Sequence, residues 1–241
     1  MHKTKITYVY SYYNNPEMFK IQQNAWLSYD KKYAEQLEII VTDDCSSKWK
    51  AKDNLLPDIR SINFRLFHID EKVKWNWLEA RNIGCHYAAG KWILMTDMDH
   101  LVKRDVLSKL FKKLPGLDDT KVYQFERMKH DGSFYKHHND SFFLTKELFW
   151  LCGGYDEDYA GYYGTSGKFR RRLYRTARAE ATRFKDLSLI LYGREVIPDA
   201  STTEFNRKEG RKKGELEKVR IWKKNNNRSI IHFKQPYHEV L

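Results

Sequence analysis

Two carboxylates separated by one residue, Asp97 and Asp99, follow directly after the apolar residues Trp92 to Met95. Such a run is typical of a strand that is covered on both faces, and parallel sheets bind ligands beyond the carboxyl ends of their strands. Because side chains i and i+2 of a strand point the same way, both carboxylates can face one hard cation. The pair therefore predicts a divalent metal site that holds a phosphorylated substrate. The alternative is a simple turn, since strands often end in aspartate for reasons of turn geometry alone.

The elements that position this pair alternate between strands and helices. We expect strands at 6–12, 37–42, 63–69 and 91–96, and helices that begin at Pro16, span 75–89 and follow Asp105. Asn15 offers an N-cap before Pro16, and Gly90 and Pro115 lie where two of the helices end. This order predicts an α/β fold with a mostly parallel central sheet, right-handed crossovers and helices on both faces.

The second half of the chain has a less regular pattern. We expect strands at 122–127 and 141–145 on either side of a histidine-rich loop, 129–139, followed by a short apolar segment, 146–150. A glycine-rich loop that begins at Gly153 comes next. Neither an internal repeat nor a low-complexity linker is present in the sequence, so we do not expect a second independent domain.

Composition limits the class of protein and its partners. With 241 residues, the chain is long enough for one α/β domain with a substantial core. The formal net charge of +12 favours polyanionic partners such as nucleic acid, anionic lipid head groups or phosphorylated substrates. Three widely spaced cysteines and the lack of a run of about 18 apolar residues predict a reduced protein without a membrane span. We expect a cytoplasmic protein, either free or peripherally bound at a membrane.

Four motifs occur in one order along the chain: Asp43-Asp44-Cys45-Ser46, Ala80-Arg81-Asn82-Ile83-Gly84, Asp97-Met98-Asp99 and Gly153-Gly154-Tyr155-Asp156-Glu157. This ordered set resembles the GT-A glycosyltransferases, in particular the family-2-like group, over roughly residues 6–173. The resemblance implies a GT-A (nucleotide-diphospho-sugar transferase) fold and a metal-dependent enzyme that moves a sugar from a nucleoside diphosphate donor to a hydroxyl acceptor. It also implies a single domain, 1–241, with a nucleotide-binding half at about 1–100, an acceptor half at 101–205 and a basic C-terminal extension at 206–241.

The resemblance assigns part of the motifs to the donor. Asp43 or Asp44 accepts hydrogen bonds from the base, and Arg81 lies near the base or the diphosphate. The other positions that the resemblance places at the donor are Tyr12, Asn82 and Met98. A capped turn at Asp43-Asp44 and a surface salt bridge at Arg81 are the structural alternatives.

The resemblance assigns the acid pair to the metal. Asp99 coordinates the cation directly, and Asp97 contacts either the ribose or a metal-bound water and is counted among the ligands. Mn²⁺ or Mg²⁺ suits ligation by carboxylate and phosphate oxygens. Many GT-A enzymes also bring a late histidine to the metal. We expect His232 in this role rather than His238, because His232 follows a short apolar strand.

The chain departs from the pattern at the position of the catalytic base. In inverting members of the group, a Glu-Asp pair after the glycine-rich loop supplies the acid that deprotonates the acceptor hydroxyl. Here the pair is replaced by Ser166-Gly167, and neither residue can act as a carboxylate base. Asp156, Glu157 or Asp158 takes this role if the loop turns inward. Inversion is therefore expected from the resemblance alone.

The acceptor is a glycan, a lipid-linked compound or another hydroxyl compound, and the basic C-terminal region offers contact with an anionic surface. Two other functions stay open. A nucleotidyltransferase on a similar fold would release pyrophosphate from a nucleoside triphosphate. A noncatalytic protein that has lost its base would bind nucleic acid or polysaccharide, and nucleic-acid binding would depend steeply on salt.

Overall fold

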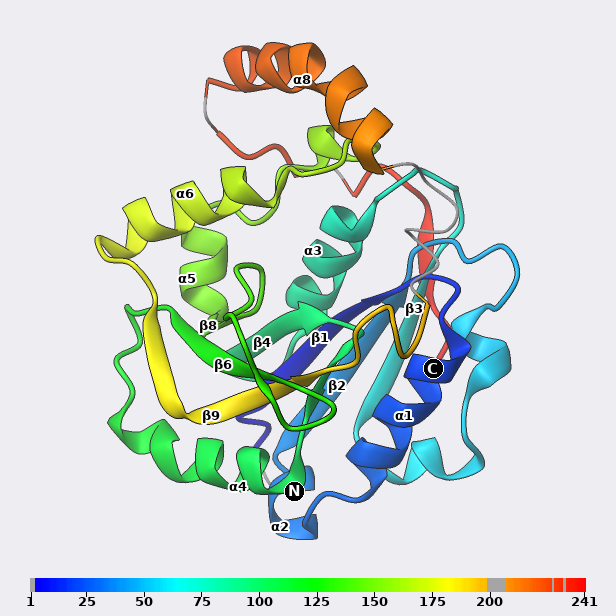
Figure 1. Cartoon of the computed structure of the whole chain (residues 1–241), viewed down its shortest axis with the longest axis vertical. Coiled ribbons are helices and arrows are strands. Elements are labelled where there is room, and N and C mark those ends of the chain that lie inside the picture. Colours follow the sequence, from blue (N-terminus) through cyan, green and yellow to red (C-terminus); the bar gives the residue numbers. More distant parts are fainter. Residues whose placement is uncertain (1–2, 199–206, 227, 232) are drawn as a thin grey trace.

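One sheet, with helices on both faces, runs through the computed structural model, which describes residues 3–198, 207–226, 228–231 and 233–241 (Figure 1). Its order is β10-β3-β2-β1-β4-β8-β6-β9-β5, and β7 pairs with β6. The strands are β1 (Ile6–Tyr12), β2 (Leu37–Asp43), β3 (Phe64–Ile69), β4 (Trp92–Asp97), β5 (His100–Val102), β6 (Tyr123–Lys129), β7 (Phe134–Tyr135), β8 (Phe142–Thr145), β9 (Thr182–Leu191) and β10 (Tyr237–Glu239).

The helices of the described part differ in length and in the face that they cover. They are α1 (Pro16–Leu27), α2 (Lys31–Ala34), α3 (Trp77–Tyr87), α4 (Arg104–Lys113), α5 (Lys146–Leu151), α6 (Ser166–Ala177) and α8 (Arg207–Lys224). Short 3-10 turns are η1 (Ala51–Asn54), η2 (Pro57–Ser61), η3 (Leu114–Gly116) and η4 (Glu157–Tyr159). No helix among the described residues is both long and apolar enough to cross a membrane.

The expected parallel sheet is confirmed for the centre of the fold, and the whole sheet is mixed. Strands β3, β2, β1 and β4 pair in parallel in that order. Antiparallel pairs add β10 to β3 on one side and β8 to β4 on the other. The expected α/β fold is therefore confirmed, with both antiparallel pairs and the parallel pair of β6 and β9 outside the central four strands.

Alternation along the central strands divides the core into two layers. On β1, Tyr8, Tyr10 and Tyr12 belong to a cluster that includes the buried side of α1 and α4. Val9 belongs to a second cluster with residues of α3, α5 and α6. Figure 1 shows these two groups of helices against opposite faces of the sheet. Because successive side chains of a strand point to opposite faces, every central strand contributes to both layers.

Local sequence explains where the helices begin. Asn15 caps α1 by accepting a hydrogen bond from the Met18 backbone N–H at 3.2 Å, and Pro16 occupies the first helical turn. The apolar segment 146–150 forms helix α5, capped by Thr145, whose hydroxyl accepts from the Leu148 N–H at 3.2 Å. Strands β9 and β10 were not expected. Charged residues interrupt the apolar pattern of β9, and β10 has only three residues.

The register of the parallel strands brings three predicted residues to one edge of the sheet. Tyr12, the last residue of β1, pairs with Asp43 at the end of β2. On the other side of β1, Ser11 pairs with Asp97 at the end of β4. The acid-bearing strand ends therefore meet at the carboxyl edge, where ligands of such sheets bind.

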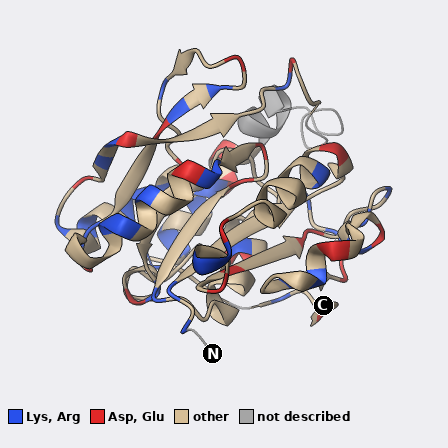
Figure 2. Cartoon of the chain, turned by 90° about the horizontal axis from the view of Figure 1, so that it is seen from below, with Lys and Arg blue, Asp and Glu red and all other residues tan. Residues whose placement is uncertain are grey.

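Charged residues lie mostly on the helices and connecting segments, and the strands of the sheet carry few of them (Figure 2). Two basic residues of α6 contact the Trp222 ring of α8: Lys168 Nζ lies 4.2 Å and Arg171 Cζ lies 5.6 Å from the ring centroid. Part of the basic segment 168–175 therefore joins two helices by cation–π contacts.

Gly90 lies between α3 and β4, directly against the backbone of β1. A Cβ atom at this position would lie 2.7 Å from both the Ile6 carbonyl carbon and the Thr7 nitrogen, which belong to a central strand. We expect Gly90→Ala to lower the free energy of unfolding by about 2 kcal/mol, because overpacking forces the backbone to shift. Urea denaturation measures this. Gly116→Ala is the matched control, since nothing lies within 4 Å of its added Cβ. An equal loss in both variants would contradict the steric explanation.

Candidate active site

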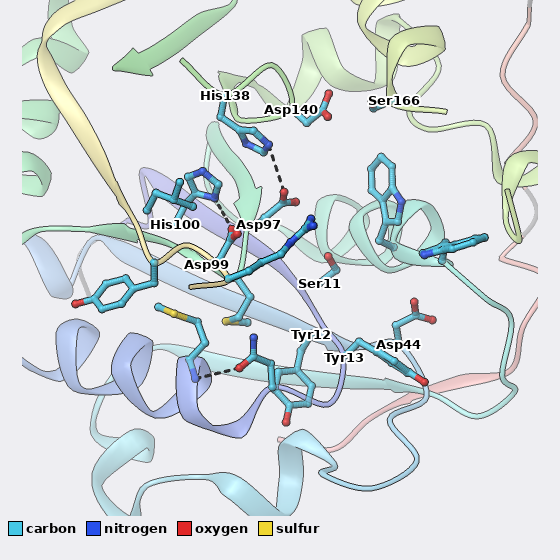
Figure 3. A pocket seen from close by; sticks show the side chains of 18 of the residues that line it. Ser11, Tyr12, Tyr13, Asp44, Asp97, Asp99, His100, His138, Asp140 and Ser166 are labelled. Atoms are coloured by element: carbon cyan, nitrogen blue, oxygen red, sulfur yellow. Dashed lines mark hydrogen bonds and ion pairs between the residues drawn. The ribbon is translucent and has the colours of Figure 1, made fainter. Parts of the chain in front are cut away.

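A cavity of about 620 Å³ lies at the carboxyl edge of β1, β2 and β4 (Figure 3). Its walls come from the strand ends and from the loops that follow them, and include Ser11, Tyr12, Tyr13, Asp44, Asp97, Met98, Asp99, His138, Asp140 and Ser166. In Figure 3, Asp97 lies between a group with Tyr12 and Asp44 on one side and a group with His138 and Asp140 on the other. The cavity thus has two ends that meet at the acid pair.

The acid pair is surrounded by histidine and arginine. Asp97 Oδ1 accepts a hydrogen bond from Arg81 Nη2 at 2.6 Å, and its Oδ2 lies 3.4 Å from His138 Nε2. Asp99 Oδ1 lies 2.6 Å from His100 Nδ1, as an ion contact without the alignment of a hydrogen bond. The imidazole rings of His100 and His138 stack with their centroids 4.4 Å apart. Cationic and neutral nitrogen groups therefore hold both carboxylates at the cavity.

These surroundings lower the pKa values of both Asp99 and His138, for different physical reasons. Burial alone raises the pKa of Asp99, but His100, with His138 and Arg127, outweighs burial and lowers it below the ordinary value. Burial lowers the pKa of His138 to about 3, although Asp97 opposes this shift. Asp99 is therefore ionised and His138 is neutral at neutral pH. An ionised carboxylate and a neutral imidazole are the forms that bind metal ions.

The residues present fit a divalent cation. Asp97, His100 and His138 each offer one ligand atom, and these atoms lie within 4.8 Å of one another. Asp99 Oδ1 is buried and accepts no hydrogen bond, so it is an acceptor that a cation would satisfy. Carboxylate oxygens suit Mg²⁺ or Mn²⁺, and imidazole nitrogens favour the transition metal. The expected ligand His232 lies outside the described residues.

Asp44 and Tyr12 line the other end of the cavity, and Asp43 does not. Asp44 is 6% exposed, its Oδ1 has no hydrogen-bond partner, and burial, with Asp43 next in effect, raises its pKa. Asp43 accepts hydrogen bonds from the backbone N–H groups of Ser46 at 2.9 Å and Ala51 at 2.8 Å. Of the two acids, Asp44 is therefore available to a ligand, and Asp43 organises the turn.

The backbone is strained at Trp75, which also lines the cavity and has a φ of 50°.

Arg81 is fully buried and joins three parts of the site. Besides Asp97, its Nη1 donates to the Tyr155 hydroxyl at 3.0 Å and to the Asp140 carbonyl oxygen at 3.1 Å. Its guanidinium lies 4.9 Å from the Trp77 ring centroid. Arg81 therefore fixes Asp97 relative to the loop before β8.

Asn82 and the expected catalytic acids do not line the cavity. Asn82 Nδ2 donates to Glu157 Oε1 at 2.8 Å, and the other carboxylate oxygen of Glu157 accepts from the Phe233 N–H at 2.7 Å. Asp156 accepts from Asn225 Nδ2 at 3.0 Å, and Asp158 accepts from Lys234 Nζ at 2.8 Å. These hydrogen bonds tie the glycine-rich loop to α3 and to the C-terminal segment.

Several residues of the cavity wall have no role that the sequence predicts. Among them are His138 and Asp140, which lie on the loop before β8, at the end of the histidine-rich segment. His138 Nδ1 lies 2.8 Å from the Ser141 hydroxyl, which orients the ring so that Nε2 faces Asp97. The high density of histidines between residues 129 and 139 is the one local feature of the sequence that indicates a site in this loop.

Comparisons with known proteins identify the family and the fold of the chain. The sequence model described as glycosyl transferase family 2 matches residues 12–196. Comparison with curated protein sequences gives no significant match. Staphylococcus aureus TarS 1-349 in complex with UDP-GlcNAc has a TM-score of 0.67 at 14% identity, covering 95% of this chain and 68% of that one. Another crystal structure of TarS 1-349 has a TM-score of 0.65 at 14% identity, covering 80% of this chain and 61% of that one.

A second similar structure is the mannosyltransferase PcManGT from Pyrobaculum calidifontis in complex with GDP-Man and Mn²⁺. Its TM-score is 0.58 at 16% identity, covering 79% of this chain and 57% of that one. The chain thus spans 61% or 68% of TarS 1-349, depending on the structure compared, and 57% of PcManGT. At these identities the similarity shows the fold, which is that of GT-A glycosyltransferases.

Proposed function

The chain belongs to glycosyl transferase family 2, and from this we propose that it moves a sugar from a nucleoside diphosphate donor to a hydroxyl group of an acceptor. One observation carries the proposal: Asp44, Asp97 and Asp99 face one cavity at the carboxyl edge of the parallel strands. The sheet edge, the acid pair and the cavity volume together suit a diphosphate and its two attached groups. Inversion at the sugar is part of the proposal on the strength of the family alone.

We assign the residues of the cavity to the parts of the donor. Tyr12 and Asp44 lie at the base end, and Met98 lies between that end and the acid pair. Asp97 and Asp99, with His138, would hold Mn²⁺ or Mg²⁺, which as a Lewis acid stabilises charge on the departing diphosphate. Arg81 orients Asp97 through the 2.6 Å hydrogen bond. The remaining assignments, including the late histidine His232, the cytoplasmic location and the basic extension after residue 206 as a contact for anionic surfaces, stay predictions.

The reaction can be tested without knowledge of the acceptor. The protein is incubated with Mn²⁺ and either UDP-GlcNAc or GDP-mannose, the donors present in the similar solved structures, and release of UDP or GDP is measured. Slow release from one donor, with water as the acceptor, is the expected result. Release of pyrophosphate from a nucleoside triphosphate would instead favour nucleotidyl transfer.

Asp44→Asn is expected to stabilise the free protein and to weaken donor binding. Because burial raises the pKa of Asp44, ionisation costs folding free energy once the pH exceeds the pKa of the unfolded chain. Asn cannot ionise, so the melting temperature should rise at pH 8 and change little well below pH 4. An amide accepts hydrogen bonds from a base more weakly than a carboxylate, and donor affinity should fall about tenfold. Thermal unfolding at both pH values and calorimetry measure the two effects. Unchanged donor affinity would remove Asp44 from the base site.

A further inference from the structure

We propose that Asp140 is the catalytic base that accepts the proton of the acceptor hydroxyl. The proposal rests on the glycosyl transfer proposed above and adds a residue that neither the motifs nor the family comparison assigns. It depends on where the carboxylates of the described residues lie and on what already binds them.

Five acidic residues line the cavity: Asp44, Asp97, Asp99, Asp140 and Glu195. Asp44 lies at the base end, away from any transferred sugar. Asp97 and Asp99 form the acid pair, where a cation and the diphosphate must lie. Glu195 is exposed to solvent. Asp140 is thus the enclosed carboxylate of the cavity wall that neither the base site nor the cation site uses.

The residues around Asp140 hold it in place and leave one carboxylate oxygen, Oδ1, without a hydrogen bond. Its backbone carbonyl oxygen accepts from the buried Arg81 at 3.1 Å, and the same guanidinium binds Asp97. The side chain is 27% exposed, and its Oδ1 is buried without a hydrogen bond. Arg170 Nη1 lies 3.6 Å from this oxygen, too far for a hydrogen bond. A buried acceptor without a donor is costly unless a substrate supplies one.

Asp140 also faces the point at which the expected Glu-Asp pair is missing. Ser166 and Gly167, which replace the pair, form the first turn of α6. Ser166 and Arg170 of this helix are among the groups that act on the Asp140 carboxylate. Figure 3 shows Asp140 and Ser166 on the same side of the cavity, across Asp97 from Asp44. The carboxylate that helix α6 lacks is therefore supplied by the loop before β8.

The step balances without a further reactant. The acceptor O–H proton passes to an Asp140 carboxylate oxygen, while the acceptor oxygen forms a bond to the anomeric carbon of the donor sugar. The bond from that carbon to the diphosphate oxygen breaks, and its electron pair leaves with the diphosphate. Asp140, then neutral, returns its proton to water. With water as acceptor, the same step gives the free sugar and the nucleoside diphosphate.

The test compares donor binding with release of the nucleoside diphosphate in the full chain with Mn²⁺. Asp140→Asn and Asp140→Ala are expected to reduce release about 100-fold or more, with donor affinity within about threefold of the unaltered protein. Sodium formate, compared with equal sodium chloride, should restore release in Asp140→Ala, since formate fits the space and accepts a proton. Asp140→Asn lacks that space and should not respond. Asp105→Asn, an exposed acid on α4, is the matched control.

The possible results separate this proposal from the function on which it rests. Loss of release with retained affinity and formate rescue supports Asp140 as the base. Release by Asp140→Asn within about threefold of the unaltered protein overturns it, and a large loss in Asp158→Asn would then make Asp158 the base. Loss of both affinity and release without formate rescue also overturns it, because the role of Asp140 is then structural. Donor binding without release by the unaltered protein, with any added acceptor, overturns the transfer reaction itself and this assignment with it.

Discussion

Asn in place of Asp99 is expected to weaken the Mn²⁺-dependent binding of the nucleotide sugar by about 100-fold or more. Even the loss of a residue that supports a metal ligand costs about 10- to 100-fold in affinity, and Asp99 is proposed as a direct ligand. Its Oδ1 is buried 2.6 Å from His100 Nδ1 without an aligned hydrogen bond, so it keeps an acceptor position that a cation would satisfy. Calorimetric titration of the donor with Mn²⁺ measures the loss.

A measurement of thermal stability distinguishes the loss of Mn²⁺-dependent binding from unfolding of the variant. Because His100 outweighs burial and lowers the pKa of Asp99, the ionised carboxylate stabilises the fold at neutral pH, so Asp99→Asn should melt at a lower temperature but remain folded at the temperature of the titration. Asp105→Asn, at an exposed acid of α4, should change both binding and stability little. Donor binding in the presence of chelator should be weak and equal in all three proteins. If Asp99→Asn binds the donor normally with Mn²⁺, the cation is not held by this carboxylate.

Met in place of Arg81 is expected to lower the free energy of unfolding by about 3 kcal/mol, the low end of the range for breaking a buried ion pair. The guanidinium is fully buried and donates to Asp97, Tyr155 and Asp140. The Asp97 side chain is 46% exposed, so water can solvate it after the change, which limits the loss. Urea denaturation gives the stability, and calorimetry should show weaker donor binding because Asp97 loses its fixed position.

The chain offers a matched control for this prediction. Arg104 pairs with Asp30 at the surface, and Arg104→Met should change stability little, since exposed ion pairs contribute little. Equal effects of Arg81→Met and Arg104→Met would show that the buried network does not stabilise the fold.

The sequence allowed the centre of the site to be predicted because its signals are local. An apolar run predicts strand β4 and places Asp97 at its carboxyl end, and Asp99 follows in the turn before β5. The parallel register then brings them near Tyr12 and Asp44, as the strand–helix alternation indicated. Three local signals therefore indicate the same edge of the sheet: the order of these residues along the chain, their positions at strand ends and their side-chain types.

The outer parts of the site could not be predicted, because long-range contacts decide them. Glu157 and Asn82 are residue types that do chemistry, yet here they bind each other across 75 positions in the sequence. Asp140 lies in a loop without periodicity, and a contact with Arg81, 59 positions away, holds it. A buried acid that is satisfied by the protein and one that awaits a substrate look the same in a sequence. In the structure, Asp156 accepts a hydrogen bond from Asn225 away from the cavity, whereas Asp140 lines the cavity with an oxygen that accepts none.

The most direct test of the account is calorimetric titration of the unaltered protein with a panel of nucleoside diphosphates and nucleotide sugars, first with Mn²⁺ and then with chelator. We expect one nucleotide sugar to bind with Mn²⁺ and to lose most of its affinity with chelator. The corresponding nucleoside diphosphate should bind under the same conditions. Absence of binding across the panel, together with tight and steeply salt-dependent binding of nucleic acid, would contradict the account and favour a noncatalytic binding protein.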